Sequence, residues 1–567
     1  MADNQNLISR LLVATGLLTE DQADRVLAAS AGAEGGIVAA AVSVAGISEE
    51  ALLKKLAPPL GMPFVALADE KPDKEAVAAL PARAAFQYGV VPVRLDDGIL
   101  DVATSDPFNT GMADGLRLAV KPRIRLVLAQ RREIEKAARK LYGVGADTLD
   151  AIEKEGGILD IDADSDFSKN DISELGQEAS IVRFVNQIIA EADRQGATDI
   201  HFEPMEDELR IRYRIDGILH KVDMPPQLNR LQAAITSRLK VMANLDIAEK
   251  RMPMDGRIGI RVNGEDIDIR VSTMPTAYGE SVSLRLLQKS GSMVKLGDLG
   301  MQPDDEALIT KLIHRPNGII LVTGPTGSGK STSLYAFLQE INRMDVRILT
   351  AEDPIEYEMP GINQVAVKSD IGLTFARILR AFLRQDPDIC MVGEIRDAET
   401  AEIAINASLT GHLVLSTLHT NDSAGAFARL IDMGVEPFLV ASAVSGVLAQ
   451  RLVRRLCRDC RRRAVIESAE WRGMALPPSL APGTAIYEAA GCERCGATGY
   501  RGRGGIFELL HVTEAIESMI IARRATADIR HLAIEQGMHT LRDDGFRNVA
   551  AGVTTLEEVM RVTEDDV

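Results

Sequence analysis

The sequence predicts a multidomain α/β protein, and three of its patterns support this fold class. From about residue 300 onward, apolar strand patterns alternate with helix patterns, as an α/β domain requires. Before that point, short alternating segments meet at Asp-Gly and Asn-Gly pairs, which favour β-hairpins. Two Cys-x-x-Cys pairs near the C-terminus predict a small metal-binding unit. At 567 residues, and about 150 residues per domain, we expect about four compact units.

The first domain is expected to span residues 1–143 and to combine helices with a small sheet. Residues 15–27 and 45–56 share a pattern, in which a glycine, apolar residues and a hydroxyl side chain precede an acidic helix start. This pattern predicts a repeated helical hairpin. Residues 90–104 alternate apolar and polar side chains around Asp97-Gly98, which predicts a β-hairpin.

A linker and a second domain are expected to follow. Residues 144–178 are acidic and poor in aromatic side chains, which is typical of a flexible linker. Residues 179–292 begin with an apolar helix face and continue with strands that turn at Asp216-Gly217 and Asn263-Gly264. The inward side chains of the second hairpin are expected to be Ile258, Ile260, Val262, Ile267, Ile269 and Val271.

A phosphate-binding loop is the strongest motif in the chain. It fits GxxxxGK[ST] and lies between an apolar strand and a helix pattern. Glycines let consecutive backbone N–H groups surround phosphates, and the helix directs its positive end at them. Lys330 is expected to reach the β- and γ-phosphates of ATP, and Ser331 to bind Mg²⁺. The expected nucleotide-binding residues are Gly324, Pro325, Thr326, Gly327, Ser328, Gly329, Lys330, Ser331 and Thr332.

Hydrolysis also needs a carboxylate that positions water, and two candidates follow apolar strands. Glu394 comes just after the strand pattern of residues 389–392, where a sheet edge would face the nucleotide. Gly393 stands where many P-loop enzymes carry aspartate, so we expect Ser331 rather than an aspartate to hold the metal. Glu352 ends another apolar strand, and its alternative interpretation is a surface acid at a strand end.

Three further motifs resemble those of one superfamily in the same order. ILTAEDPIEYE is similar to the Asp box, ICMVGEIRD to the Walker B segment, and TGHLVLSTLHTNDS to the His box of the secretion ATPases. This superfamily comprises the type II secretion ATPases called GspE and their pilus-assembly counterparts. The resemblance implies a RecA-like ATPase domain over residues 293–567, a PAS-like α+β domain over 179–292 and an N-terminal docking domain over 1–143.

The resemblance also implies roles for individual side chains. Glu394 would be the principal catalytic carboxylate, with Glu352 assisting with water or metal. His412 and His419 would sense the γ-phosphate side, although residue chemistry alone equally allows each to be a satisfied core histidine. Arginines near the γ-phosphate would stabilise charge and couple hydrolysis to domain movement. The family pattern nominates Arg270, Arg285, Arg380, Arg384 and Arg396, and any single one of them could instead be a surface arginine.

The four paired cysteines predict a structural zinc site. Cys457, Cys460, Cys492 and Cys495 have the spacing of a zinc ribbon, in which two tight turns present four thiolates. The 31-residue gap between the pairs is longer than usual, so an inserted loop is expected within residues 455–498. By the resemblance, type II secretion and pilus extension ATPases share this insert and retraction ATPases usually lack it. The remaining Cys390 is expected to be a buried strand thiol.

The net charge, an arginine-rich run and the N-terminal residues restrict the expected partners and cellular location of the protein. A net charge of −18 and a pI near 5.1 disfavour nucleic acid as a substrate, and a DNA-translocating motor with it. The run RLVRRLCRDCRRR holds seven arginines, which are either a solvated, ion-paired face or a contact for anionic lipid. The first residues lack a secretory signal and no long apolar run follows, so a cytoplasmic protein is expected.

Two machines and one regulatory role follow from the resemblance. The favoured function is a homohexameric ATPase that powers type II protein secretion, peripheral on the inner membrane, with GspL-like and GspF-like partners. The alternatives are a type IV pilus assembly ATPase and a cyclic di-GMP sensor in the N-terminal domain. Residues 8–18 keep Arg10 and Leu11 of the nucleotide-binding repeat but have leucine where that motif has glycine.

Overall fold

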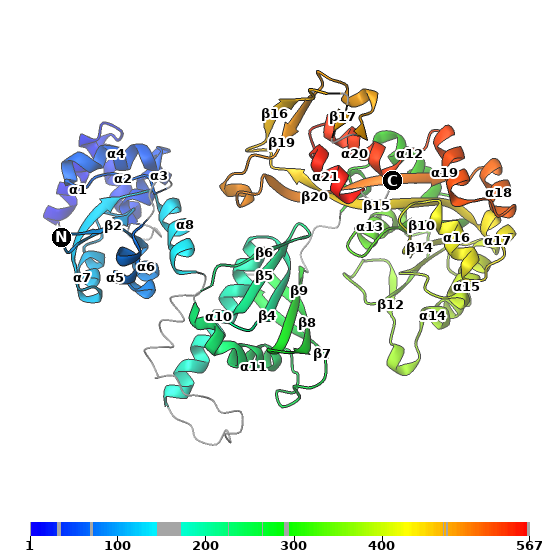
Figure 1. Cartoon of the computed structure of the whole chain (residues 1–567), viewed down its shortest axis with the longest axis horizontal. Coiled ribbons are helices and arrows are strands. Elements are labelled where there is room, and N and C mark those ends of the chain that lie inside the picture. The colour runs from blue at the N-terminus through cyan, green and yellow to red at the C-terminus, as the bar shows by residue number, and fades with distance from the viewer. Residues whose placement is uncertain are drawn as a thin grey trace. The chain divides into compact units, whose positions relative to one another are not determined.

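The computed structural model describes residues 2–30, 36–67, 72–143, 172–224, 226–262, 265–288, 294–468, 470–471 and 474–563. The chain forms two compact units, residues 1–288 and 289–567 (Figure 1). The division follows directly after the last strand of the second predicted domain. Among the described helices, none combines the length and apolar character that crossing a bilayer requires.

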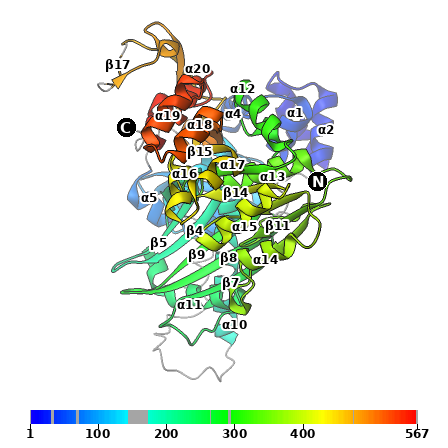
Figure 2. The same cartoon turned by 90° about the vertical axis from the view of Figure 1, so that its right-hand side faces the viewer.

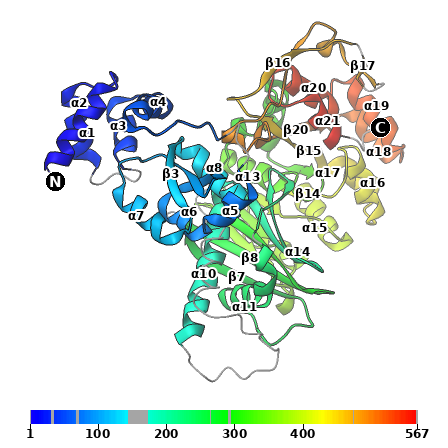
Figure 3. The same cartoon turned by 60° about the vertical axis from the view of Figure 1, so that its left-hand side comes forward.

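The N-terminal part of the first unit pairs a helical cluster with a small α/β layer (Figure 3). Its helices are α1 (Ala2–Ala14), α2 (Glu20–Ser30), α3 (Gly36–Ala45), α4 (Glu49–Leu60), α5 (Lys74–Ala79), α6 (Ala82–Tyr88), α7 (Thr110–Ala119) and α8 (Arg131–Tyr142). Its sheet has the order β1 (Val90–Asp96), β2 (Ile99–Thr104), β3 (Arg123–Leu128). Asp97 and Gly98 adopt positive φ angles of 47° and 76°, so the predicted hairpin is confirmed.

The second part of this unit is a six-stranded antiparallel sheet in the order β6-β5-β4-β9-β8-β7 (Figure 2). The elements are α10 (Ile172–Arg194), β4 (Ala197–Pro204), β5 (Leu209–Ile215), β6 (Ile218–Lys221), η1 (Pro226–Leu231), α11 (Gln232–Met242), β7 (Met254–Val262), β8 (Glu265–Thr276) and β9 (Gly279–Gln288). Buried side chains of α10 and α11 join those of the strands in one core, which covers one face of the sheet.

Two predictions made from the sequence concern this domain and can be compared with the structure. Five of the six inward side chains expected for the β7–β8 hairpin are buried, and Ile260 is partly buried against the same core. The expected linker is wrong at its end, because α10 already begins at Ile172. A helix that packs on the core can extend through polar residues, so composition alone placed the boundary too late. The rest of the linker, residues 144–171, lies outside the described residues.

The second unit is built on a seven-stranded sheet in the order β12-β11-β13-β14-β10-β15-β20. Its strands are β10 (Gly318–Thr323), β11 (Ile348–Glu352), β12 (Asn363–Ala366), β13 (Ile389–Val392), β14 (Leu413–Leu418), β15 (Val444–Leu456) and β20 (Tyr500–His511). All neighbouring strands are parallel except the last pair, β15 and β20. Strands β10, β11, β13 and β14 are buried along their whole length, as expected for a parallel sheet covered on both faces.

Helices cover both faces of this sheet and extend to the C-terminus. They are η2 (Leu296–Asp298), α12 (Pro303–Ile313), α13 (Lys330–Ile341), η3 (Ser369–Ile371), α14 (Phe375–Phe382), α15 (Ala398–Leu409), α16 (Gly425–Asp432), α17 (Pro437–Ala443), α18 (Glu514–Ile521), α19 (Thr526–Glu535), α20 (Leu541–Ala550) and α21 (Leu556–Val562). Between β15 and β20 an insert holds β16 (Arg462–Val465), β17 (Glu470–Trp471), β18 (Met474–Ala475), η4 (Pro478–Leu480), β19 (Ala485–Glu488) and η5 (Glu493–Cys495).

A buried carboxyl group on α20 makes the stability of the second unit depend on pH. Asp544 is fully buried, and its Oδ2 accepts a hydrogen bond of 3.0 Å from the Phe507 N–H, while its Oδ1 has no partner among the described residues. Burial, with the nearby charge of Asp305, raises the pKa of Asp544 to about 7. The stability that the neutral form contributes is therefore complete below pH 3.8 and is lost as the pH rises through about 7.

We expect Asp544→Asn to stabilise this unit more at pH 8 than at pH 5, by roughly 2 to 3 kcal/mol, because the native carboxyl group loses its proton between these pH values. The amide can still accept from Phe507 but carries no charge. Urea unfolding midpoints at the two pH values measure the effect. The control is Asp304→Asn, since Asp304 is half-exposed and paired with Arg547 at 2.8 Å. An equal loss of stability at both pH values would show that charge at Asp544 is not the cause.

Candidate functional site

The glycine-rich loop joins β10 to α13 in a form that only glycine permits. Gly324 and Gly329 have φ angles of +144° and +90°. A Cβ at Gly324 would lie 2.5 Å from the Gln450 carbonyl oxygen, and one at Gly329 would lie 2.7 Å from the Gln450 side chain. Gln450 is held in turn by Ser333, whose hydroxyl donates to its Oε1 at 2.7 Å. Strand β15 therefore packs against the side of the loop. The glycines allow the loop backbone to approach Gln450 of this strand closely.

The cation of the loop lies beside the backbone that would surround phosphates. Lys330 Nζ donates to the carbonyl oxygens of Gly324 at 2.8 Å and Pro325 at 3.1 Å. Burial lowers the pKa of Lys330, and the charge of Glu394 opposes this shift. Ser328 Oγ is buried without a hydrogen-bond partner among the described residues. The Ser328 hydroxyl and the positive charge of Lys330 on one glycine-rich loop fit the polyphosphate of ATP.

Glu394 and His419 meet at the carboxyl edge of the sheet, next to the loop. Glu394 follows β13 and His419 follows β14, and the two strands are parallel neighbours. His419 Nε2 lies 3.3 Å from Glu394 Oε2, and Arg396 Nη2 donates to Glu394 Oε1 at 2.5 Å. Burial acts to raise the pKa of Glu394, but the bond and charge of Arg396, with His419, outweigh it and lower the pKa. The carboxylate is therefore ionised at neutral pH.

Glu352 is buried at the end of β11, so it is not a surface acid. Tyr335 donates its hydroxyl to Oε2, while Thr350 and Gln364 donate to Oε1 at 2.5 and 3.0 Å. These donors fix the orientation of the carboxylate. Sequence reasoning missed all three. Of the three, only Tyr335 could have been suspected from the local sequence. It lies four residues after Ser331 and therefore on the same side of α13.

His412 does not join this group. It precedes β14, where Leu413 pairs with Gly318 at the start of β10, whereas Leu418 pairs with Thr323 at the loop end. The six residues of β14 put His412 and His419 about 20 Å apart at opposite edges of the sheet. His412 Nδ1 instead lies 2.8 Å from the Ala407 carbonyl oxygen. The expectation that His412 senses the γ-phosphate is therefore not supported within one chain.

The nominated arginines fall into separate groups. Arg396 bonds Glu394, as described above. Arg380 pairs with Glu399 at 2.5 Å, and Arg384 Nη1 donates to the Arg380 carbonyl oxygen at 2.9 Å, both near the end of α14. In the first unit, Arg270 on β8 lies directly opposite Arg285 on β9. The register thus places these two side chains together on the face of the sheet away from its core.

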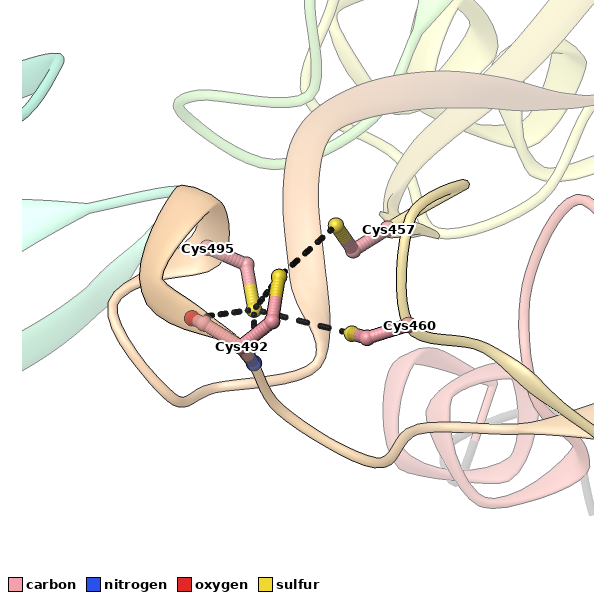
Figure 4. A group of neighbouring side chains, drawn as sticks. All are labelled: Cys457, Cys460, Cys492 and Cys495. Atoms are coloured by element: carbon pink, nitrogen blue, oxygen red, sulfur yellow. Dashed lines mark hydrogen bonds between the residues drawn. The ribbon is translucent and has the colours of Figure 1, made fainter. Parts of the chain in front are cut away.

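Four cysteines converge in the insert (Figure 4). Two sulfur pairs, Cys457 with Cys492 and Cys460 with Cys495, are each 3.8 Å apart, and Cys492 and Cys495 are 3.7 Å apart. Sulfurs 2.3 Å from one tetrahedral zinc ion would be separated by about 3.8 Å, so the geometry fits a closed Cys₄ site. Burial acts to raise the pKa of Cys495, but backbone N–H groups, including that of Gly499, lower it to about 7.

The fifth cysteine is unrelated to this cluster. Cys390 is fully buried in β13, where burial raises the pKa of its thiol to about 12. The expected buried strand thiol is confirmed.

Part of the arginine run beside the cysteines is structural. Arg454 donates to Glu558 at 2.8 Å and lies 4.0 Å from the centre of the Tyr500 ring. Arg461 donates to the Gly552 carbonyl oxygen at 2.6 Å. The exposed members of the run are Arg455, Arg458, Arg462 and Arg463. The ion-paired interpretation therefore accounts for some of the run, and four cations remain on the surface.

Comparison with known proteins places these features in one family. The model of the type II/IV secretion system protein family matches residues 174–561, and the MshEN domain model matches residues 60–148. The chain is 42% identical over 530 residues to the type IV pilus assembly ATPase PilB of Myxococcus xanthus, covering 93% of each chain. It is 43% identical over 527 residues to type II secretion system protein E of Xanthomonas campestris pv. campestris, covering 92% of this chain and 91% of that one.

A solved structure supports the fold. The ATPase DotB of Yersinia pseudotuberculosis superposes with a TM-score of 0.51 and 20% identity, over 68% of this chain and 94% of DotB. With the phosphate-binding loop, the edge carboxylate and the matched family model, the sequence-level resemblance is confirmed. The chain belongs to the type II/IV secretion system protein family and is an ATPase.

Proposed function

We propose that this ATPase is the homohexameric motor of a type II protein secretion machine, acting at the cytoplasmic face of the inner membrane. The observation that carries the proposal is the edge site, in which Lys330, Glu394 and His419 surround the place where a triphosphate would lie. Support for the machine comes from relatives named type II secretion system protein E, one of which aligns with 92% of this chain.

In the proposed reaction, the loop residues Gly324 to Thr332 bind the triphosphate through backbone N–H groups and Lys330. Magnesium, when bound, neutralises charge on the phosphate oxygens, and Ser331 is the residue that would hold it. Glu394 orients the attacking water and accepts its proton, while Arg396 and His419 hold the Glu394 carboxylate. Glu352 assists from the neighbouring strand, where its three donors keep it from rotating.

Energy coupling is proposed to involve arginines from other parts of the chain. Arg270 and Arg285 would supply positive charge to the γ-phosphate during turnover, and Arg380 and Arg384 would do so from the ATPase domain. Such contacts made only in one nucleotide state would convert hydrolysis into movement of one domain against another.

Zinc and partner proteins complete the proposal. The cysteine cluster would hold one structural Zn²⁺, supported by its sulfur spacing. Residues 1–143 would dock on a GspL-like inner-membrane assembly protein, and the motor would act on a GspF-like platform protein. The exposed arginines Arg455, Arg458, Arg462 and Arg463 would meet anionic lipid head groups.

Two alternatives each rest on a specific observation. Pilus assembly is favoured by the 42% identity to a type IV pilus assembly ATPase over most of both chains. A cyclic di-GMP sensor is favoured by the MshEN match at residues 60–148. Calorimetry of the full chain with cyclic di-GMP would detect such binding directly.

The choice between the machines can be tested in the source bacterium. We expect replacement of the native copy by the Glu394→Gln allele to remove a set of proteins from the culture medium and to leave surface pili intact. Mass spectrometry of the medium and electron microscopy of the cells measure the two outputs. Loss of pili with unchanged secretion would select pilus assembly instead.

A further inference from the structure

The segment that carries His419 joins β14 to α16. It runs from His419, which directly follows the strand, to Gly425, the first residue of the helix, and we call residues 419–425 the His419 loop. The His419 side chain is 51% exposed, yet its Nε2 lies 3.3 Å from Glu394 Oε2. Packing holds a half-exposed ring only weakly, so the position of His419 depends on the backbone that carries it.

The start of the His419 loop is fixed by the sheet. Near the end of β14, the Thr417 hydroxyl donates to the Gly393 carbonyl oxygen at 2.7 Å. The Thr417 carbonyl oxygen accepts a bond of 3.0 Å from the Ile395 N–H. These two bonds lie on either side of Glu394 in the sequence, so they hold the end of β14 against the backbone that carries this carboxylate.

Two long hydrogen bonds tie the middle of the His419 loop to the next strands of the sheet. The Thr323 hydroxyl, at the end of β10, donates to the Asp422 carbonyl oxygen at 3.4 Å. Arg451 Nη2, on β15, donates to Asn421 Oδ1 at the same distance. Bonds of this length are weak, so they orient the loop without fixing it.

The attachment near the end of the loop is shorter and buried. The Ser423 N–H and hydroxyl both donate to Glu508 Oε1, at 2.9 and 2.5 Å, and both residues are fully buried. Glu508 lies on β20, opposite Ala449 of β15. Burial raises the pKa of Glu508, and the bonds from Ser423 with the charge of Arg530 act against this rise. Loss of the acceptor would leave two buried donors of Ser423 unpaired.

Glu508 is also close to the C-terminal helix α19. Its Oε2 lies 3.7 Å from Arg530 Nη2. Neither Glu508 Oε2 nor Arg530 Nε has a hydrogen-bond partner in the part of the chain that the structure describes. A buried carboxyl group that is only half satisfied adds little stability, and what it does provide is a fixed position for Ser423.

We propose that Glu508 is a positioning residue for ATP hydrolysis, which anchors the His419 loop through Ser423 and so keeps the His419 ring beside the Glu394 carboxylate. The inference rests on the proposed function, in which Glu394 activates water and His419 holds Glu394. It adds a residue of β20 that acts through the loop and is not itself catalytic.

The first test compares Glu508→Leu with Glu508→Gln in the full chain. The amide oxygen of glutamine can accept both bonds from Ser423, whereas leucine fills the space and accepts neither. We expect Glu508→Leu to lower kcat for ATP by a factor of about 10 to 100, because misplacement of a group that holds the catalytic carboxylate costs turnover. KM should be unchanged, since residues 324–332 are intact. Glu508→Gln should retain most of the parental kcat.

A milder pair of variants keeps the test valid if Glu508→Leu does not fold. Ser423→Ala removes the hydroxyl and keeps the backbone bond to Glu508, so its kcat should lie between those of Glu508→Leu and the parent. The matched control is Ser408→Ala. Ser408 is also buried, but its hydroxyl donates to the Ile405 carbonyl oxygen within α15. Ser408→Ala should therefore keep the parental kcat.

A double-mutant cycle shows whether Glu508 acts through His419. We expect His419→Ala to lower kcat, and Glu508→Leu to lower it no further once His419 is absent. A residue that only stabilises the fold would lower kcat again in the His419→Ala background.

Three outcomes overturn the proposal: a parental kcat in the folded Glu508→Leu protein, or in Ser423→Ala if that protein does not fold; an equal loss with and without His419; and a Glu508→Gln protein as inactive as Glu508→Leu. Glu394→Gln is measured in parallel. If Glu394→Gln is inactive while Glu508→Leu keeps the parental kcat, this inference fails and the proposed function stands. Hydrolysis by Glu394→Gln at the parental rate overturns both.

Discussion

A purified Glu394→Gln variant is expected to lose ATP turnover by a factor of about 10² to 10⁴ while still binding nucleotide. The amide keeps the size of the carboxylate but cannot accept a proton from water, and general-base catalysis contributes a factor of this order. Binding should persist because, in the proposed site, the loop and Lys330 rather than Glu394 would contact the phosphates. Phosphate release and displacement of a fluorescent nucleotide measure the two quantities.

The matched control is Glu402→Gln, which removes an exposed acid from α15 and should leave turnover unchanged. Glu394→Gln also removes a charge that opposes the lowering of the Lys330 pKa, so nucleotide binding must be measured and not assumed. Hydrolysis by Glu394→Gln at the parental rate, under conditions where the parent is assembled, would show that another group activates the water.

Removal of one of the proposed zinc ligands is expected to have the largest effect on structure. Cys457→Ser should reduce bound zinc from one per chain to nearly none and unfold the insert between β15 and β20. Structural zinc contributes about 10 to 16 kcal/mol to the folding of small zinc-binding peptides. The insert contributes only Ile466, Leu480 and Ile486 to the buried apolar cluster that it shares with α20 and α21. Elemental analysis gives the stoichiometry, and limited proteolysis detects opening of residues 461–491.

Cys390→Ala provides the control for the zinc experiment, because Cys390 is buried in β13 and lies outside the cluster. We expect it to retain the full zinc content, whatever its cost in packing. A Cys457→Ser protein with one zinc per chain and an intact insert would mean that the sulfur cluster holds no metal in the native protein.

Local motifs allowed much of this site to be predicted from the sequence. Each of three features can be recognised from a few consecutive residues: the glycine-rich loop, the carboxylate after β13 and the two cysteine pairs. The His box shows the limit of such reasoning. His412 and His419 belong to one motif, yet a six-residue strand separates them and sends them to opposite edges of the sheet.

Contacts between distant segments could not be predicted in the same way. Asp199 and Arg285 bond across a separation of 86 residues, and only the strand register brings them together. The three donors to Glu352 come from two other segments and from its own strand, so no spacing rule identifies them as a set. Composition likewise placed the start of α10 too late, because the helix already begins at Ile172, in sequence as polar as the segment before it.

Strand β15 connects the two chemical centres of the second unit. Gln450 lies against the glycine-rich loop, and the strand continues without interruption to Leu456, directly before Cys457. Its antiparallel partner β20 stiffens it over nearly this whole length. A single continuous strand therefore joins the residue that supports the phosphate-binding loop to the first cysteine of the cluster, and β20 holds it by hydrogen bonds along the way.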